Sequence, residues 1–279
     1  MEARTSMRKP LTVALLLVMP LVLLALADAS QAQLVLSDDF NTKPINPAKW
    51  FGTELSPGGA SPNTEANRKL SGGHLEIDLT NYGRSDSNSG TAGEANEALR
   101  TTNPALITTT FQVDVAVKSI AAIDCPANPA STFTSALVIG AWFNDGTSPN
   151  PGGGDRTGDI NAGIEKAMSS KLGTFIAAFV TRCTNASCST RDSVGFHTFT
   201  TALTKDALDT LRIQWDQPNH RFIFSVNQEQ TVLGYTVSDT HAAVLNFKNI
   251  GIESFAANCT TQRTVASAKV LFDNVMVNP

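Results

Sequence analysis

Long apolar runs are missing from the sequence beyond its first 32 residues. No later segment approaches the roughly 20 apolar residues that a membrane-spanning helix needs. Residues 1–32 differ, because a basic start precedes an apolar run at 11–27 and small residues follow it. This order predicts a secretory signal peptide that is cleaved after Ala29 or after Ala32. An uncleaved membrane anchor is the alternative, but we expect the exported chain, residues 33–279, to bind no membrane.

Basic charge is also in short supply. Charged residues make up 16% of the chain, and 21 are basic against 25 acidic. Residues 1–32 carry three of the basic and two of the acidic residues, so 18 and 23 remain, a net charge of −5. Such a chain lacks the basic surface that phosphate backbones require, so we expect no nucleic-acid partner. Its length is ordinary for a single all-β sandwich domain at 33–279.

Histidine and nucleophile motifs are scarce too. The four histidines are scattered singly, which disfavours a zinc site. The sequence has no Gly-x-Ser-x-Gly turn, which argues against a serine hydrolase. These absences remove two common classes of catalytic site.

The chain has only four cysteines, and all lie in the part predicted to be exported. In an oxidising compartment they predict two disulfides, for which three pairings are possible. The segment CTNASC places Cys183 and Cys188 at the two ends of a tight turn between apolar runs. This favours a bond between them, which leaves Cys125 to pair with Cys259.

Sustained helical periodicity is absent, and the best candidate, at 205–211, allows about one turn. Short runs with period-two alternation take its place, such as FQVDVAVK at 111–118, and polar turn residues separate them. The segment at 211–227 predicts a hairpin with QPNH as its turn. Further strands are predicted at 74–79, 135–143, 160–167, 174–182, 194–200, 245–255 and 268–277. Many short strands of this kind predict an all-β, two-sheet antiparallel sandwich.

Four segments together resemble the secreted concanavalin A-like lectin/glucanase domains: DDFNTKPINPAKW (38–50), RKLSGGHLEIDL (68–79), LRIQWDQPNHRFIFSVN (211–227) and FDNVMVN (272–278). The resemblance spans essentially the whole exported chain. It implies a jelly-roll sandwich with one concave sheet, whose hollow face often holds a saccharide in relatives. Each segment is a structural signature and none is a catalytic motif, so activity does not transfer with the fold.

One strand partly matches the glucanase pattern Glu-x-Asp-x-Glu. Glu76 and Asp78 occupy the first two positions, but the third is Thr80, whose hydroxyl cannot protonate a leaving oxygen. A four-residue spacing on a strand is what brings two carboxylates to the separation of a retaining mechanism. The intervening positions are apolar, which favours a solvated strand face over an active site. On a concave sheet, however, Glu76 and Asp78 would contact sugar hydroxyls.

Two long polar loops, at 83–96 and 144–159, are expected to carry function or to be mobile. Trp142 leads into the second loop and is a candidate ligand contact at the rim of the concave face. Tyr82 and Arg84 enter the first loop and are candidates for the same reason. Other acid pairs lie in these regions, but no spacing singles them out: Glu94 with Glu97, and Asp155 with Asp159.

Calcium is the ion that the resemblance implies, where the first and last strands of such sandwiches meet. The matching residues are Asp38 or Asp39 and Asp273. Asp273 is expected to share a strand face with Val275 and Val277, where a carboxylate needs a partner. A backbone amide or a basic side chain is the alternative partner to calcium.

These observations predict a secreted, disulfide-bonded, non-catalytic glycan-binding or surface module, found in the periplasm, on the cell surface or in the medium. Polysaccharide or another glycan is the expected partner. A glycoside hydrolase or polysaccharide lyase with an unrecognised site is the first alternative. An extracellular structural or adhesive protein is the second.

Overall fold

Two antiparallel sheets form the protein in a computed structural model that describes residues 33–51, 63–101 and 108–278. The predicted signal peptide lies outside these residues. The β6 sheet has, in spatial order, β13 (Glu229–Gly234), β12 (Arg221–Val226), β11 (Leu208–Asp216), β6 (Thr110–Ile123), β16 (Val265–Val277), β4 (His74–Tyr82) and β3 (Thr64–Ser71), with β1 (Val35–Asp38) beside β16.

The β7 sheet has the order β10 (Arg191–Thr198), β9 (Gly173–Cys183), β8 (Asp159–Ser169), β7 (Phe133–Asn144), β15 (Lys248–Ala257), β5 (Thr91–Thr101) and β2 (Trp50–Phe51), with β14 (His241–Ala242) beside β7. The described chain contains no α-helix, only the 3₁₀ turn Gln217–Asn219 at the predicted QPNH hairpin. None of its helical segments is long and apolar enough to cross a membrane. The predicted all-β jelly-roll sandwich is confirmed.

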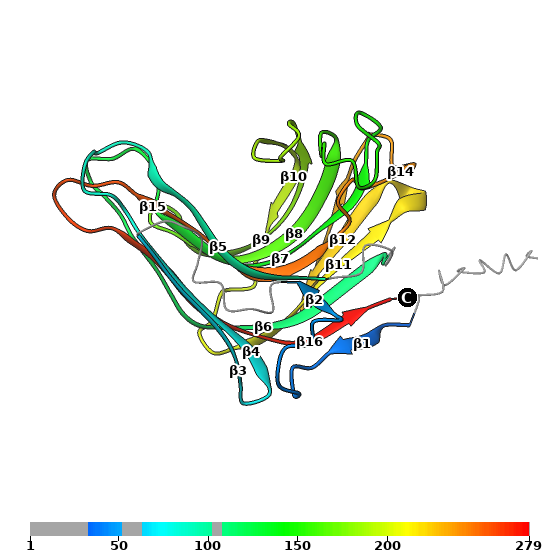
Figure 1. Ribbon diagram of the computed structural model, residues 1–279, viewed down its shortest axis with the longest axis horizontal. Helices are drawn as coiled ribbons and strands as arrows, with labels where there is room; N and C mark the ends of the chain where they lie inside the picture. Colours follow the sequence, from blue (N-terminus) through cyan, green and yellow to red (C-terminus); the bar gives the residue numbers. More distant parts are fainter. Residues whose placement is uncertain (1–32, 52–62, 102–107, 279) are drawn as a thin grey trace, which may run out of the picture. The chain divides into compact units, whose positions relative to one another are not determined.

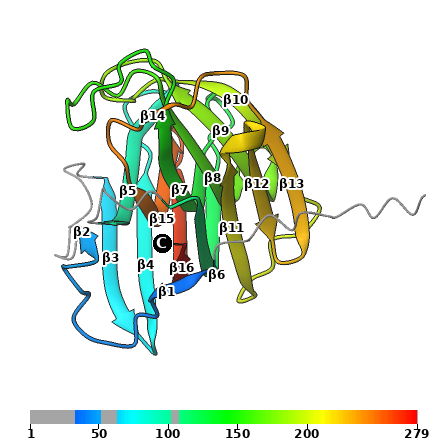
Figure 2. The same ribbon diagram turned by 90° about the vertical axis from the view of Figure 1, so that its right-hand side faces the viewer.

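Apolar alternation builds the core between the two sheets (Figure 1). On the β6 sheet, β4 buries every second residue completely, as its sequence pattern predicts: Leu75, Ile77 and Leu79. On the β7 sheet the matching inward residues of β7 and β8 are Ala136, Val138, Ala162 and Ile164. Burying one large apolar side chain stabilises a fold by about 1.5–3 kcal/mol, so these two faces supply most of the driving force. The β7 sheet is curved, and its outer face, which points away from the β6 sheet, is concave (Figures 1 and 2).

Two expectations about local structure are wrong. Residues 205–211 form no helical turn, because a turn from Thr204 to Ala207 leads directly into β11, where Leu208 pairs with Ala116. The predicted loop at 83–96 is a loop only in its first part, since β5 begins at Thr91. Pairing with β15 over eight register positions decides this assignment. Six residues that looked like loop therefore belong to the β7 sheet.

Two pairs of oppositely charged residues lie between the sheets. Lys166 of β8 is fully buried and its Nζ lies 2.6 Å from the Asp209 carboxylate of β11. Arg68 of β3 and Glu97 of β5 form a second buried pair at 2.6 Å. Each pair joins one sheet to the other, and removing one partner would leave an uncompensated charge in the interior.

Asp209→Asn should lower the free energy of unfolding by about 3–5 kcal/mol, because it leaves the Lys166 ammonium buried without a counter-charge. Urea unfolding at pH 7 measures the change. The double variant Lys166→Met with Asp209→Leu should recover most of the loss, since it removes both charges. Lys205→Met, at an exposed position, is the control, with an expected effect within about 0.5 kcal/mol. Equal losses in the single and double variants would contradict the pairing.

Candidate functional site

The outer face of the β7 sheet carries a hollow of about 180 Å³ that we call the charged hollow. Its floor is made of residues without polar side chains on three neighbouring strands: Ala98 of β5, Gly251 of β15 and Leu137 of β7. A Cβ atom on Gly251 would lie 2.5 Å from the Ala98 Cβ and the Glu97 carbonyl oxygen. Glycine is therefore required there by close packing of the strands, and it keeps the floor low.

Two phenylalanine side chains continue the floor on the next strands. A Cβ atom on Gly163 of β8 would lie 2.5 Å from the Phe179 ring of β9, so this ring covers the glycine. Phe196 of β10 pairs with Phe179 and is 57% exposed. The two rings offer an apolar surface beside the charged hollow.

Carboxylates gather at one end of the charged hollow. Glu94 of β5 and Glu253 of β15 line it, and Glu165 of β8 stands beside it, across Leu137 in the strand register. Burial and the nearby charge of Glu253 raise the pKa of Glu165 to about 7. Burial and the nearby Glu94 raise the pKa of Glu253 to about 7. Near neutral pH these groups can therefore both hold and release protons.

Arginines gather at the other end. Arg100 of β5 and Arg156 place their guanidinium carbons 4.9 and 5.3 Å from the centroid of the Phe247 ring. Burial lowers the pKa of Arg100. Burial and the neighbouring arginines also lower the pKa of Arg156, although the nearby Asp159 carboxylate acts to raise it. Arg191 also lines the hollow, and its charge acts on both Arg156 and Glu253. Along β5, Arg100 and Glu94 are six residues apart on one face, or about 20 Å.

The short disulfide holds this basic end in place. Cys183 and Cys188 are bonded, and the Asn161 side-chain amide donates to both sulfurs, at 3.2 and 3.5 Å. The Arg191 guanidinium donates to the Cys188 carbonyl oxygen at 3.2 Å. Both predicted disulfides are present in the structure, since Cys125 is bonded to Cys259.

Glu76 and Asp78, predicted as ligand contacts, lie on the outer face of the β6 sheet and not in the charged hollow. The Glu76 carboxylate lies 3.0 Å from Lys69 Nζ and 2.9 Å from Lys269 Nζ. Burial acts to raise the pKa of Glu76, but hydrogen bonds from both lysines bring it below its usual value. Asp78 pairs with Lys269 in the strand register. Glu76 is 9% exposed, so two lysine side chains cover its carboxylate on this face.

Trp142 does not lie at the rim of the concave face, which corrects that expectation. It is 5% exposed, faces the core, and packs edge-on against Phe222. A register shift between Ala141 and Phe143 lets β7 send both Trp142 and Phe143 inward. The bulge overrides the alternation that sequence reasoning assumes.

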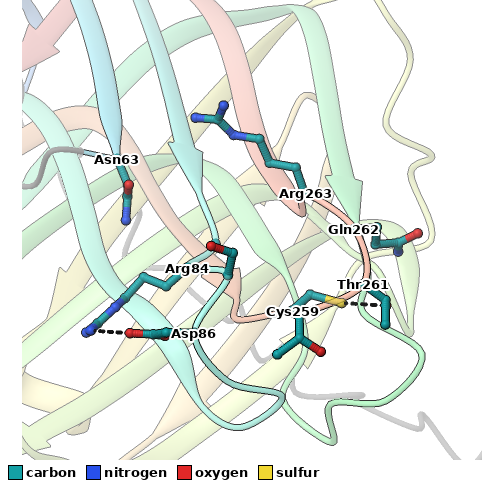
Figure 3. A pocket seen from close by; sticks show the side chains of 10 residues that line it. Asn63, Arg84, Asp86, Cys259, Thr261, Gln262 and Arg263 are labelled. Carbon is teal, nitrogen blue, oxygen red and sulfur yellow. Dashed lines mark hydrogen bonds and ion pairs between the residues drawn. The ribbon is translucent and has the colours of Figure 1, made fainter.

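Tyr82 ends β4 and Arg84 follows it, in a region separate from the charged hollow. Figure 3 shows Arg84 in this region. Arg84 lines a cleft of about 570 Å³ together with Arg263 and Asp86, and its guanidinium lies 2.6 Å from the Asp86 carboxylate. The Arg263 guanidinium lies 3.9 Å from the centroid of the Tyr82 ring. The structure brings these two predicted residues near each other, but not near the charged hollow.

The predicted calcium residues have protein partners. The Asp39 carboxylate accepts a hydrogen bond from the Asn41 backbone amide at 3.2 Å. The Asp273 carboxylate lies 3.1 Å from His74 Nδ1. Asp273 does not share a face with Val275 and Val277, because a bulge between Asp273 and Met276 turns the strand. Within the described ranges no group of three or more His, Cys, Asp or Glu could hold a metal ion. Calcium at this position stays a prediction.

Sequence reasoning missed most of the charged hollow. Glu94 was noted only as part of an acid pair, and Glu165, Glu253 and the arginines were not singled out. The signal was present in β5, where GEANEALR alternates and places Glu94 and Arg100 on one face. In β8 the adjacent charges of Glu165 and Lys166 follow the short run Ala162, Gly163 and Ile164.

Comparisons with known proteins concern the fold. No family model and no curated protein matches the chain. Among solved structures it is similar to a GlcNAcα1-4Gal-releasing endo-β-galactosidase from Clostridium perfringens, with a TM-score of 0.48 and 12% identity over 88% of this chain and 62% of that one. The chain thus spans less than two thirds of that protein.

Two further similarities cover nearly all of the other chain. A laminarinase from Flavobacterium sp. UMI-01 gives a TM-score of 0.42 and 11% identity over 86% of this chain and 100% of that one. The carbohydrate-binding module CBM66 from Bacillus subtilis gives 0.34 and 10% over 77% and 95%. These similarities concern the fold alone.

The raised pKa values of Glu165 and Glu253 predict a pH-dependent stability. Between about pH 4.5 and 7 the folded protein binds more protons than the unfolded chain, so the free energy of unfolding should fall as pH rises through this window. One shift of this size corresponds to about 3 kcal/mol. The double variant Glu165→Gln with Glu253→Gln should flatten the fall, and urea unfolding from pH 4.5 to 8 measures it. Glu65→Gln, on the β6 sheet, is the control, and an unchanged slope in the double variant would contradict the assignment.

Proposed function

We propose that this protein is an exported glycan-binding protein that holds an acidic polysaccharide along the charged hollow. The observation that carries the proposal is one groove with arginines toward one end and carboxylates toward the other, above a floor of Ala98, Leu137 and Gly251. Guanidinium groups bind carboxylates and sulfates in a planar, two-pronged geometry, so Arg100, Arg156 and Arg191 suit acidic sugar units. The carboxylates and amides of the other end suit hydroxyl groups.

The shape of the site supports a polymer over a small ligand. The lining of the groove extends about 20 Å along β5, from Arg100 to Glu94. Asn96 and Asn249 line it between the two charged ends and present amide groups. The Glu94 carboxylate accepts a hydrogen bond from the Asn96 side-chain amide at 2.9 Å, which orients both groups. The exposed ring of Phe196 and the half-buried ring of Phe179 extend the surface sideways and suit the apolar face of a sugar ring.

Arg100→Gln should weaken retention by polygalacturonate at least tenfold in affinity electrophoresis, because a charge-assisted hydrogen bond contributes about 1.5–3 kcal/mol. Retention by the wild type should weaken with added salt, as exposed charge pairs do. Arg212→Gln, on the β6 sheet, is the matched control and should bind as the wild type does. Equal retention of both variants, or stronger retention by neutral dextran, would exclude the charged hollow as the site.

Catalysis on the same groove is the second candidate function, and the pair Glu165 and Glu253 favours it. Each carboxyl is held near neutral pKa by burial and by a neighbouring carboxylate, which is the condition for general acid and base roles. The two come from different strands, β8 and β15, and therefore form no Glu-x-Asp-x-Glu pattern. A positioned acid or base contributes about 10²–10⁴-fold to a rate.

Reducing-end release from a polysaccharide panel distinguishes the two candidates. For the binding function we expect retention without release. If release occurs, Glu253→Gln should lower its rate at least 100-fold while retention persists, and Glu65→Gln should leave it unchanged. Release that survives in both Glu253→Gln and Glu165→Gln would remove this pair from the chemistry.

A further inference from the structure

Lys248 is a buried basic residue, and its partners differ from those of the buried Arg68 and Lys166. Arg68 and Lys166 each have a carboxylate at 2.6 Å, whereas Lys248 is 3% exposed and forms no ion pair with any residue that the structure describes. Its Nζ donates to the Ala141 carbonyl oxygen at 3.0 Å and to Asn246 Oδ1 at 3.4 Å. A buried ammonium without a counter-charge is costly, which makes its place in the fold informative.

A cavity of about 300 Å³ adjoins this lysine, separate from the charged hollow. It lies at the end of the sandwich where β7 and β11 approach, and Trp142 and Trp215 form its apolar wall. Lys248 Nζ lies 4.1 Å from the centroid of the Trp142 ring. A water molecule occupies about 30 Å³ in the liquid, so the cavity has room for roughly ten, or for one small ring.

The other side of the cavity is polar and acidic. Asp239 lines it, is 5% exposed, and accepts hydrogen bonds from the Tyr235 hydroxyl at 2.6 Å and His220 Nδ1 at 3.0 Å. Thr240 and His241 also line it. Oxygen and nitrogen acceptors on this side suit ligand hydroxyl groups, while an anionic group would be repelled from Asp239 and drawn toward Lys248.

We propose that this cavity binds a hydroxylated carboxylate of the size of a single sugar acid. Its carboxylate pairs with Lys248, its ring lies against Trp142 and Trp215, and its hydroxyls bond to the Asp239 side. The ligand thereby supplies the counter-charge that the fold does not. This site is independent of the charged hollow, and its failure would leave the proposed function intact.

The state of the lysine supports the proposal. Burial lowers the pKa of Lys248 to about 7, and burial is its sole cause. A carboxylate beside the amine would restore its charged form, as opposite charges do. Asp239, His220 and His241 are the other titratable groups toward the cavity, so the experiment is run at one pH, 6, where the amine is protonated.

The experiment titrates the purified protein with sodium glucuronate and, separately, with glucose, which has the same ring without the carboxylate. Calorimetry and tryptophan fluorescence report binding, since Trp142 and Trp215 line the cavity. We expect saturable glucuronate binding and at least tenfold weaker glucose binding. A wild type that does not distinguish the two sugars would overturn the proposal, and this comparison needs no variant.

Variants assign the binding to the cavity. Lys248→Met should reduce glucuronate affinity at least tenfold, and Lys248→Gln keeps a donor for Ala141 if the methionine variant does not fold. Lys269→Met, on the β6 sheet, is the matched control and should bind as the wild type does. Arg100→Gln should also leave glucuronate affinity unchanged. Binding that survives Lys248→Met or Lys248→Gln but is lost in Arg100→Gln would move it to the charged hollow and overturn the proposal.

Discussion

Charges that lie between two apolar sheets must find partners there, and this constraint sets the orientation of the strands that build the outer face. Glu97 of β5 pairs with Arg68, and Lys166 of β8 pairs with Asp209, each across the two sheets. Because successive side chains of a strand point to opposite faces, an inward Lys166 turns Glu165 outward. An inward Glu97 likewise leaves Glu94 and Arg100 to the outer face. The charged hollow therefore depends on ion pairs that it does not contain.

Lys248 is also an inward charge, but it has no carboxylate partner among the residues described. It points inward from β15, which turns Asn249, Gly251 and Glu253 toward the charged hollow. Unlike Lys166 it faces a cavity and has hydrogen-bond partners only, among the residues described. One strand thus contributes to two separate sites, a polymer groove on its outer side and a small cavity at the sandwich end.

Small residues and charges have complementary roles in the groove. Gly251 allows β15 to approach Ala98 closely, and Gly163 leaves room for the Phe179 ring. Larger residues at these positions would fill the floor and raise it to the level of the surrounding side chains. The low floor leaves Glu253 and Glu165 partly surrounded by protein, and this burial raises their pKa values toward neutrality. The packing of the floor is therefore linked to the pKa values of Glu165 and Glu253.

Much of the fold was predictable from local patterns, since alternation at Leu75, Ile77 and Leu79 identifies β4 and its buried face. The site was less predictable, because its residues come from strands that are distant in sequence and adjacent only in the sheet. The sequence suggested Glu76 and Asp78, since they match a pattern within one strand, yet the sheet order places them on the opposite side of the sandwich. Trp142 and Asp273 were misplaced for another reason: β-bulges change the alternation, and no local signal marks them.

The sequence by itself determined the all-β class, many of the strand positions and the disulfide pairing, because period-two alternation and a tight Cys183–Cys188 turn are local properties. Only the tertiary structure decided which carboxylates meet, that β5 begins within an apparent loop, and that Lys248 is buried without a carboxylate among its described neighbours. Those outcomes depend on strand order and register, which long-range pairing sets. A carboxyl group acquires a pKa near 7 only when other strands surround it.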